Sequence, residues 1–197
     1  MNDGQRKMGK EIYLKDIEAL FKKSPVVSAS SISRLMRSKK GVTQYQKQLI
    51  RNLLLKGKIK KLVKGHYTIY DDPSLAVFCF KPAYLGLQDA LSFHEVWEQE
   101  TIPVIITASK ARQGMRKVLG MNILVKRIDK RYLFGYEHVM QGNLYYPYSD
   151  LEKTFIDMGY FRQQLSEETL HAIKERVDKK KLHSYLRNYP KRFRERF

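Results

Sequence analysis

The stretch KGKIKKLVKGHYTI, residues 56–69, interleaves five lysines with apolar and aromatic side chains. Residues 58–63 and 66–70 are rich in β-forming side chains, and Lys64-Gly65 between them is a turn sequence. A charge run alone is usually a solvated surface, whereas this mixture around one glycine is typical of a folded hairpin. We therefore predict a β-hairpin whose apolar side chains pack on a core and whose lysines project around the turn.

Three amphipathic helices are expected ahead of the hairpin, because apolar side chains recur at helical spacing in residues 11–23, 30–39 and 43–56. Pro25 ends the first helix, since proline cannot continue the hydrogen-bond ladder, and Gly57 ends the third. Three short helices followed directly by a hairpin is the element order of a winged helix-turn-helix domain. In that design the third helix lies in the DNA major groove and the hairpin, or wing, contacts the flanking backbone.

Charge is unevenly distributed along the 197 residues, whose formal net charge is +18. Residues 1–72 hold 17 Lys and Arg against 6 Asp and Glu, a net of +11. Residues 73–165 hold 11 against 9, a net of +2, and residues 166–197 hold 10 against 5, a net of +5. A balance this basic favours a polyanion or an acidic protein as partner. The turn sequence at 71–74 lies where the balance changes, so we place a domain boundary after residue 72.

The predicted fold class is α+β, with a winged helix-turn-helix domain at 1–72, a small mixed α/β interaction domain at 73–165 and a helical basic tail at 166–197. The middle domain is expected to contain helices over 82–97 and 150–161 and strands over 103–107, 122–128, 132–139 and 144–148. In the tail, basic residues alternate with phenylalanines after Pro190. That pattern fits a nucleic-acid or partner contact and a frayed, solvated end equally well.

Candidate DNA contacts fall in three groups, chosen because Gln, Arg and Lys read base edges and Lys binds phosphate. The third helix supplies Thr43, Gln44, Lys47, Gln48 and Arg51; the wing supplies Lys58, Lys60, Lys61, Lys64 and His66; the start of the second helix adds Ser30, Ser31 and Arg34. Any exposed helix has a polar face, so the helix alone would carry little weight. The element order, the basic hairpin and the local charge together favour double-stranded DNA as partner.

No enzymatic signature is found, and we expect no catalytic residue, metal or cofactor. The carboxylates of Asp150, Glu152 and Asp157 share one short helix, but Lys153 can neutralise them and Asp150 is well placed as a helix cap. The single cysteine, Cys79, cannot build a disulfide framework or a zinc site. Without a signal-peptide block or an 18-residue apolar run, the sequence predicts a cytoplasmic protein that does not enter membranes.

Four sequence blocks resemble the AbiEi family of antitoxins, also described as predicted transcriptional regulators of viral defence systems. The resemblance covers about residues 12–162. The blocks are SASSISRLM followed by QLIRNLLLKGKIKKLVKGHYTI, then PAYLGLQDALSFHEVW, PVIITAS and YSDLEKTFIDMGYF. The first is generic among winged helices, whereas the order of all four is more specific.

The resemblance implies a two-part protein. An N-terminal domain would bind inverted repeats in its own promoter and repress the operon, and a C-terminal domain would counter a cognate nucleotidyltransferase-like toxin. Glu152, Lys153 and Asp157 match the last block, where a structural role is implied. This chain departs from the family pattern in its compact middle domain and its basic tail.

Three hypotheses from different classes follow. The first is a DNA-binding repressor that also acts as an antitoxin. The second is a protein-interaction module whose basic surface meets an acidic partner. The third is a nuclease that acts through carboxylates of the middle domain.

Overall fold

The computed structural model describes residues 15–36 and 42–197. Contacts divide the chain into two compact units. The first comprises residues up to Leu75 together with Val118–Gly120, and the second comprises Ala76–Lys117 and Met121–Phe197. Each unit is described by itself below.

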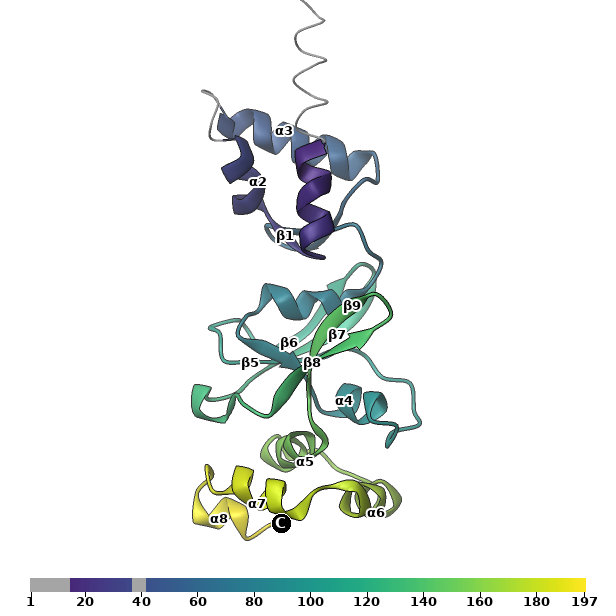
Figure 1. The fold of residues 1–197 in the computed structure, drawn as a ribbon, viewed down its shortest axis with the longest axis vertical. Helices are drawn as coiled ribbons and strands as arrows, with labels where there is room; N and C mark the ends of the chain where they lie inside the picture. The colour runs from purple at the N-terminus through teal and green to yellow at the C-terminus, as the bar shows by residue number, and fades with distance from the viewer. Residues whose placement is uncertain (1–14, 37–41) are drawn as a thin grey trace, which may run out of the picture. The chain divides into compact units, whose positions relative to one another are not determined.

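The first unit contains helices and a small antiparallel sheet (Figure 1). Its elements are a helix at 15–23, β1 (Val27–Ser28), α2 (Ala29–Met36), α3 (Val42–Leu55), β2 (Lys60–Val63) and β3 (His66–Thr68). The strand order is β1-β3-β2, with both pairs antiparallel. The predicted hairpin is confirmed, and so are the three predicted helices in their described parts; residues 11–14 and 37–39 of those predictions lie outside the described residues.

Local sequence explains where these elements begin and end. The Ser28 hydroxyl accepts a hydrogen bond from the Ser31 amide at 3.1 Å and caps α2. After α3, Gly57 adopts a φ of +64°, and the amide of Lys58 donates to the Leu53 carbonyl at 2.9 Å. This is a Schellman-type end, which glycine favours because it has no Cβ. Gly65, at φ +78°, makes the hairpin turn.

One hydrophobic core holds the first unit together. It is formed by the buried side chains of Ile17, Phe21, Val27, Ile32, Leu49, Ile50, Leu53, Ile59 and Tyr67. The hairpin contributes two of these residues, Ile59 and Tyr67, so its apolar side chains anchor it to the helices. Each such side chain stabilises the fold by about 1.5–3 kcal/mol relative to exposure.

The second unit is a mixed six-stranded sheet with helices (Figure 1). Its strands are β4 (Ala83–Leu85), β5 (Val104–Thr107), β6 (Gly114–Val118), β7 (Met121–Arg127), β8 (Tyr136–Gln141) and β9 (Leu144–Ser149). The order is β6-β7-β5-β4-β9-β8, so β6 and β8 are the edges. β4 runs parallel to β9 and β5 runs parallel to β7, whereas β4–β5 and β8–β9 are antiparallel.

The helical elements of this part of the chain pack against the sheet and against one another. They are η1 (Pro73–Cys79), α4 (Gln88–Phe93), η2 (Lys130–Tyr132), α5 (Leu151–Tyr160), α6 (Glu167–Arg176), α7 (Lys179–Leu186) and α8 (Lys191–Arg194). Helix α5 lies between the sheet and the C-terminal helices (Figure 1). Residues of the predicted basic tail, including Ile173, Val177, Leu186 and Tyr189, share one core with Leu151 and Phe155 of α5.

The expected helix over 82–97 is wrong at its start, where the chain forms strand β4 before the short helix α4. Two neighbouring residues prevent a continuous helix. A Cβ on Gly86 would lie 2.6 Å from the Cδ1 of Ile106, so the Ile106 side chain occupies the space beside the Gly86 backbone. Leu87 has a φ of +56°, which an α-helix cannot contain. Strand β6 was not expected, since GMRKV carries neither strict alternation nor a β-branched run.

The other predicted elements of the middle domain are confirmed. Strands β5, β7, β8 and β9 correspond to the four expected segments, with β8 beginning later than predicted. The Asp150 carboxylate caps α5 by accepting from the Lys153 amide at 2.7 Å, and the Ser166 hydroxyl caps α6 by accepting from the Thr169 amide at 3.1 Å. The fold is therefore α+β. Among the described residues, no helix has the length and apolar character needed to cross a membrane.

Candidate nucleic-acid interface

Helix α3 buries one face and exposes a polar face. Gln46, Leu49, Ile50 and Leu53 are buried at the i, i+3, i+4, i+7 spacing of a helical stripe. The predicted DNA-reading residues on the opposite side are all exposed: Gln44, Lys47, Gln48 and Arg51. The side chain of Thr43, the fifth residue of that group, lies outside the described residues. The structure thus brings four of the five together on one exposed helical face.

Gln46 has a different role from its exposed neighbours. Its Nε2 donates to the carbonyl oxygen of Ala29 at 2.7 Å, which ties α3 to the start of α2. Sequence reasoning did not single it out, although its helical spacing with Leu49 and Ile50 was a usable signal. Tyr45, between Gln44 and Gln46 in the sequence, is 37% exposed.

The exposed face of α3 offers several hydrogen-bond donors. Gln48 Nε2 donates to Asn52 Oδ1 at 3.2 Å, which leaves its own amide oxygen available. Neither Lys47 nor Arg51 has a salt-bridge partner among the residues that the structure describes. Free guanidinium, ammonium and amide groups are the groups that recognise base edges and phosphates.

The hairpin presents its lysines unequally. Lys58, Lys61 and Lys64 are exposed, whereas Lys60 is half-buried and forms an ion pair with Asp71. The ring Nδ1 of His66 lies 3.4 Å from the carbonyl oxygen of Lys64, across the turn at Gly65. Strand β2 has an irregular register between Lys61 and Val63, which keeps Leu62 and Tyr67 buried while Lys61 faces solvent. Three of the predicted wing lysines are therefore available to a ligand.

The start of α2 is a cluster of hydroxyl groups. The Ser28 hydroxyl lies 2.7 Å from that of Ser30 and 2.9 Å from that of Ser31, and the Arg34 side chain is exposed. These hydroxyls are engaged in capping the helix, yet each retains lone pairs or a rotatable proton.

The middle-domain carboxylates considered for chemistry all have structural partners in the second unit. Asp150 caps α5 and also accepts a hydrogen bond from the Tyr185 hydroxyl at 2.8 Å. Glu152 accepts from the Asp178 amide at 2.8 Å, and Asp157 forms a buried ion pair with Lys153. No group of three or more His, Cys, Asp or Glu side chains in the described part of the chain could hold a metal ion. These contacts fit the structural role implied for this helix.

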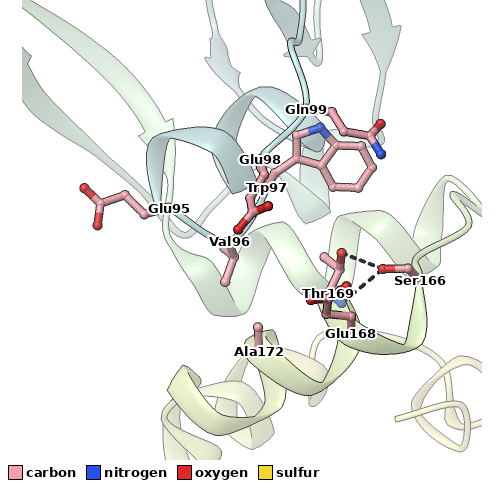
Figure 2. A pocket seen from close by; sticks show the side chains of 9 residues that line it. All are labelled: Glu95, Val96, Trp97, Glu98, Gln99, Ser166, Glu168, Thr169 and Ala172. Carbon is pink, nitrogen blue, oxygen red and sulfur yellow. Dashed lines mark hydrogen bonds between the residues drawn. The ribbon is translucent and has the colours of Figure 1, made fainter.

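A pocket of about 420 Å³ opens in the second unit between the end of α4 and the start of α6. Its lining includes Trp97 and three glutamates, Glu95, Glu98 and Glu168. Figure 2 shows Glu95 pointing away from the other two glutamates, and the Ser166 hydroxyl bonded to Thr169 beside them. A hollow lined by carboxylates repels phosphate, so this pocket does not extend the candidate nucleic-acid interface.

Comparisons with known proteins show a similarity of fold only. No protein-family model and no curated protein matches this sequence. Among solved structures, the chain is similar to the crystal structure of the RV2827C protein from Mycobacterium tuberculosis, with a TM-score of 0.60 and 14% sequence identity. The match covers 91% of this chain and 72% of the other, so the similarity extends through both units.

Proposed function

We propose that this protein is a DNA-binding transcriptional regulator whose first unit acts as a winged helix-turn-helix domain. The observation that carries the proposal is the exposed face of α3, where Gln44, Lys47, Gln48 and Arg51 stand together without a salt-bridge partner among the described residues. The three-stranded sheet that ends in the β2–β3 hairpin supports the same interpretation. In this proposal α3 enters the major groove and the hairpin follows the flanking phosphates.

The two surfaces have different tasks in the proposed complex. Bidentate contacts from Gln to adenine and from Arg to guanine distinguish base pairs, so Gln48 and Arg51 are the proposed specificity residues. Lys58, Lys61 and Lys64 contact phosphates, which adds affinity and a salt dependence but no sequence information. Lys60 contributes less directly, because Asp71 already neutralises it.

We further propose, from the AbiEi resemblance, that the chain represses its own operon and acts as the antitoxin of a neighbouring nucleotidyltransferase-like toxin. Inverted repeats in the upstream DNA are the proposed operator. The second unit is the proposed antitoxin half, and the intramolecular contacts of Glu152, Lys153 and Asp157 support a structural role for that helix in it.

A competition gel shift tests the regulator proposal directly. The full chain is titrated onto a labelled duplex from its own upstream DNA, and unlabelled upstream or scrambled duplex is added as competitor. For a specific regulator, the concentration of scrambled duplex needed to displace the labelled DNA is about 10³-fold or more higher than that of upstream duplex. Equal competition by the two duplexes would overturn the proposal and leave the basic protein-interaction module as the better account.

A further inference from the structure

Positive charge is concentrated at the β6 edge of the second unit, although the net charge of the middle of the chain is small. Residues 101–128 contain six Lys and Arg and no Asp or Glu, although residues 73–165 as a whole carry a net of only +2. The six, here called the edge cations, are Lys110, Arg112, Arg116, Lys117, Lys126 and Arg127. They belong to the loop that follows β5 and to strands β6 and β7.

Most of the edge cations gather at one end of two neighbouring strands, whereas Lys117 lies at the other end, beside the turn between β6 and β7. Thr107 of β5 pairs in parallel with Arg127 of β7, so the loop after β5 leaves the sheet beside the end of β7. The Gln113 side-chain oxygen accepts from the Arg127 amide at 3.0 Å, which holds this loop against that strand end. The Arg116 guanidinium in turn donates to the carbonyl oxygen of Arg112. Residues distant in sequence thus form one basic corner.

The charge of this corner is not neutralised by any carboxylate of the described residues. None of the edge cations forms a salt bridge with a carboxylate in the part of the chain that the structure describes. Arg116 lies 5.0 Å from the ring centre of Phe80, and Lys126 lies 5.1 Å from that of Phe161. Cation–π contacts of this kind orient a side chain while keeping its charge. The remaining four, Lys110, Arg112, Lys117 and Arg127, are exposed.

Protection of a sheet edge against pairing with other chains does not explain this distribution. Charged residues on edge strands do prevent such pairing. The opposite edge, β8, has the sequence YEHVMQ, which contains no Lys or Arg and leaves Met140 65% exposed. Strand β8 has no cation, whereas strand β6 carries Arg116 and Lys117, and four further cations lie beside it in the loop after β5 and on β7. The β6 edge therefore fits an anionic partner.

We propose that the edge cations form a second DNA-contacting surface, which binds backbone phosphates of duplex DNA without reading base sequence. The inference rests on the proposed function, since it assigns the second unit a share in binding the same class of ligand. Cations spread over a loop and two adjacent strands can contact several phosphates along a duplex, whereas a compact anion would contact only a few of them. Strand alternation turns Arg116 and Lys117 to opposite faces, so charge is presented on both sides of the edge.

The test removes the four exposed edge cations by Lys110→Ala, Arg112→Ala, Lys117→Ala and Arg127→Ala in the full chain. A charge-matched control removes four exposed cations of the C-terminal helices by Lys174→Ala, Lys179→Ala, Lys180→Ala and Arg187→Ala. Binding of a random-sequence duplex is measured by fluorescence anisotropy over a range of salt concentrations. Each lost phosphate contact flattens the plot of log K against log salt by about 0.9, so the edge variant is expected to lose about 2 to 4 from the slope.

A third variant keeps the charge by Lys110→Arg, Arg112→Lys, Lys117→Arg and Arg127→Lys, and is expected to retain the wild-type slope. An edge variant whose slope equals that of the control would overturn the inference. Because the duplex is random in sequence, this readout is independent of any operator. If the wild type fails to prefer its upstream DNA while the edge variant still flattens the slope, the regulator proposal falls and the edge surface stands. If the wild type prefers its upstream DNA while the edge variant keeps the control slope, the edge surface falls and the regulator proposal stands.

Discussion

Lys153 and Asp157 form an ion pair on one face of α5 in which both side chains are completely buried. The other Asp157 oxygen accepts a hydrogen bond from the Tyr84 hydroxyl at 2.5 Å, and Lys153 Nζ donates to the Tyr189 hydroxyl at 3.1 Å. The ammonium also lies 5.1 Å from the ring centre of Phe134. This network joins α5 to strand β4 and to the segment after α7, which explains why the basic C-terminal part packs as a layer of the second unit.

Removing one partner of this pair should destabilise the protein severely. Lys153→Met leaves an unpaired buried carboxylate and Asp157→Leu leaves an unpaired buried ammonium, and each is expected to cost about 3–5 kcal/mol of unfolding free energy. The double substitution should cost much less than the sum, because no lone charge remains. Urea unfolding of the four proteins measures the coupling. Additive losses would show that the pair does not act as a unit.

Cys79 should react slowly with thiol reagents in the folded protein. Burial raises its pKa from 9.0 to about 12, and the nearby Lys81 only partly opposes this. At a given pH below 9, the thiolate fraction is about 10³-fold lower in the folded protein than in urea. A thiolate of higher pKa is intrinsically more nucleophilic, which offsets part of this difference. Alkylation of the folded protein is therefore expected to be about 30-fold slower than in urea.

The pH dependence of Cys79 has a definite sign. The folded state holds the thiol proton more tightly, so the unfolded state loses it first and this group lowers stability as pH rises above 9. Reaction with iodoacetamide should accelerate up to about pH 12 in the folded protein and level off near pH 9 in the unfolded one. Since Cys79 is the single cysteine, no other thiol contributes to the signal. A folded-state profile that levels off near pH 9 would contradict this account.

The wing lysines should contribute affinity without specificity. Lys61→Ala with Lys64→Ala removes two exposed cations of the hairpin, so the slope of log K against log salt should flatten by about 2. The ratio between upstream and scrambled DNA should stay the same. Lys22→Ala with Lys23→Ala, on the first helix, is a control of equal charge. A changed sequence preference in the wing variant would mean that the hairpin reads bases.

Two glutamines of α3 should behave differently when each is changed to alanine. Gln46→Ala removes the buried hydrogen bond to Ala29 and is expected to cost about 1–3 kcal/mol of stability. Gln48→Ala alters an exposed position and should change stability by less than about 0.5 kcal/mol. Thermal unfolding measures the stability of both variants. Equal stability losses would mean that Gln46 does not pin α3 to α2.

Local signals predicted most of the elements, and long-range contacts account for what was missed. Gly57, Gly65, Asp150 and Ser166 end or cap elements through bonds within a few residues, which sequence spacing reveals. Strand β4 depends instead on pairing with β5, a partner about twenty residues away whose approach requires a glycine at position 86.

The candidate site shows the same division. The exposed face of α3 follows from helical periodicity, so it was predicted, and Gln46 belonged to the same pattern. The partner of Lys60 and the tyrosine partners of Asp157 and Lys153 could not be read from composition. Asp71 lies across the hairpin, and Tyr84 and Tyr189 come from distant parts of the chain. The basic β6 edge was hidden by averaging, since the acidic residues that offset it lie outside residues 101–128.

The most direct test of the central claim, that α3 reads DNA sequence, compares the wild type with the Gln48→Ala/Arg51→Ala variant by anisotropy on upstream and scrambled duplexes at one salt concentration. We expect the wild type to bind upstream DNA about 10³-fold or more tightly than scrambled DNA. The variant should lose about 1–3 kcal/mol per base contact on upstream DNA only. Equal weakening on both duplexes, or a wild-type ratio near one, would contradict the account.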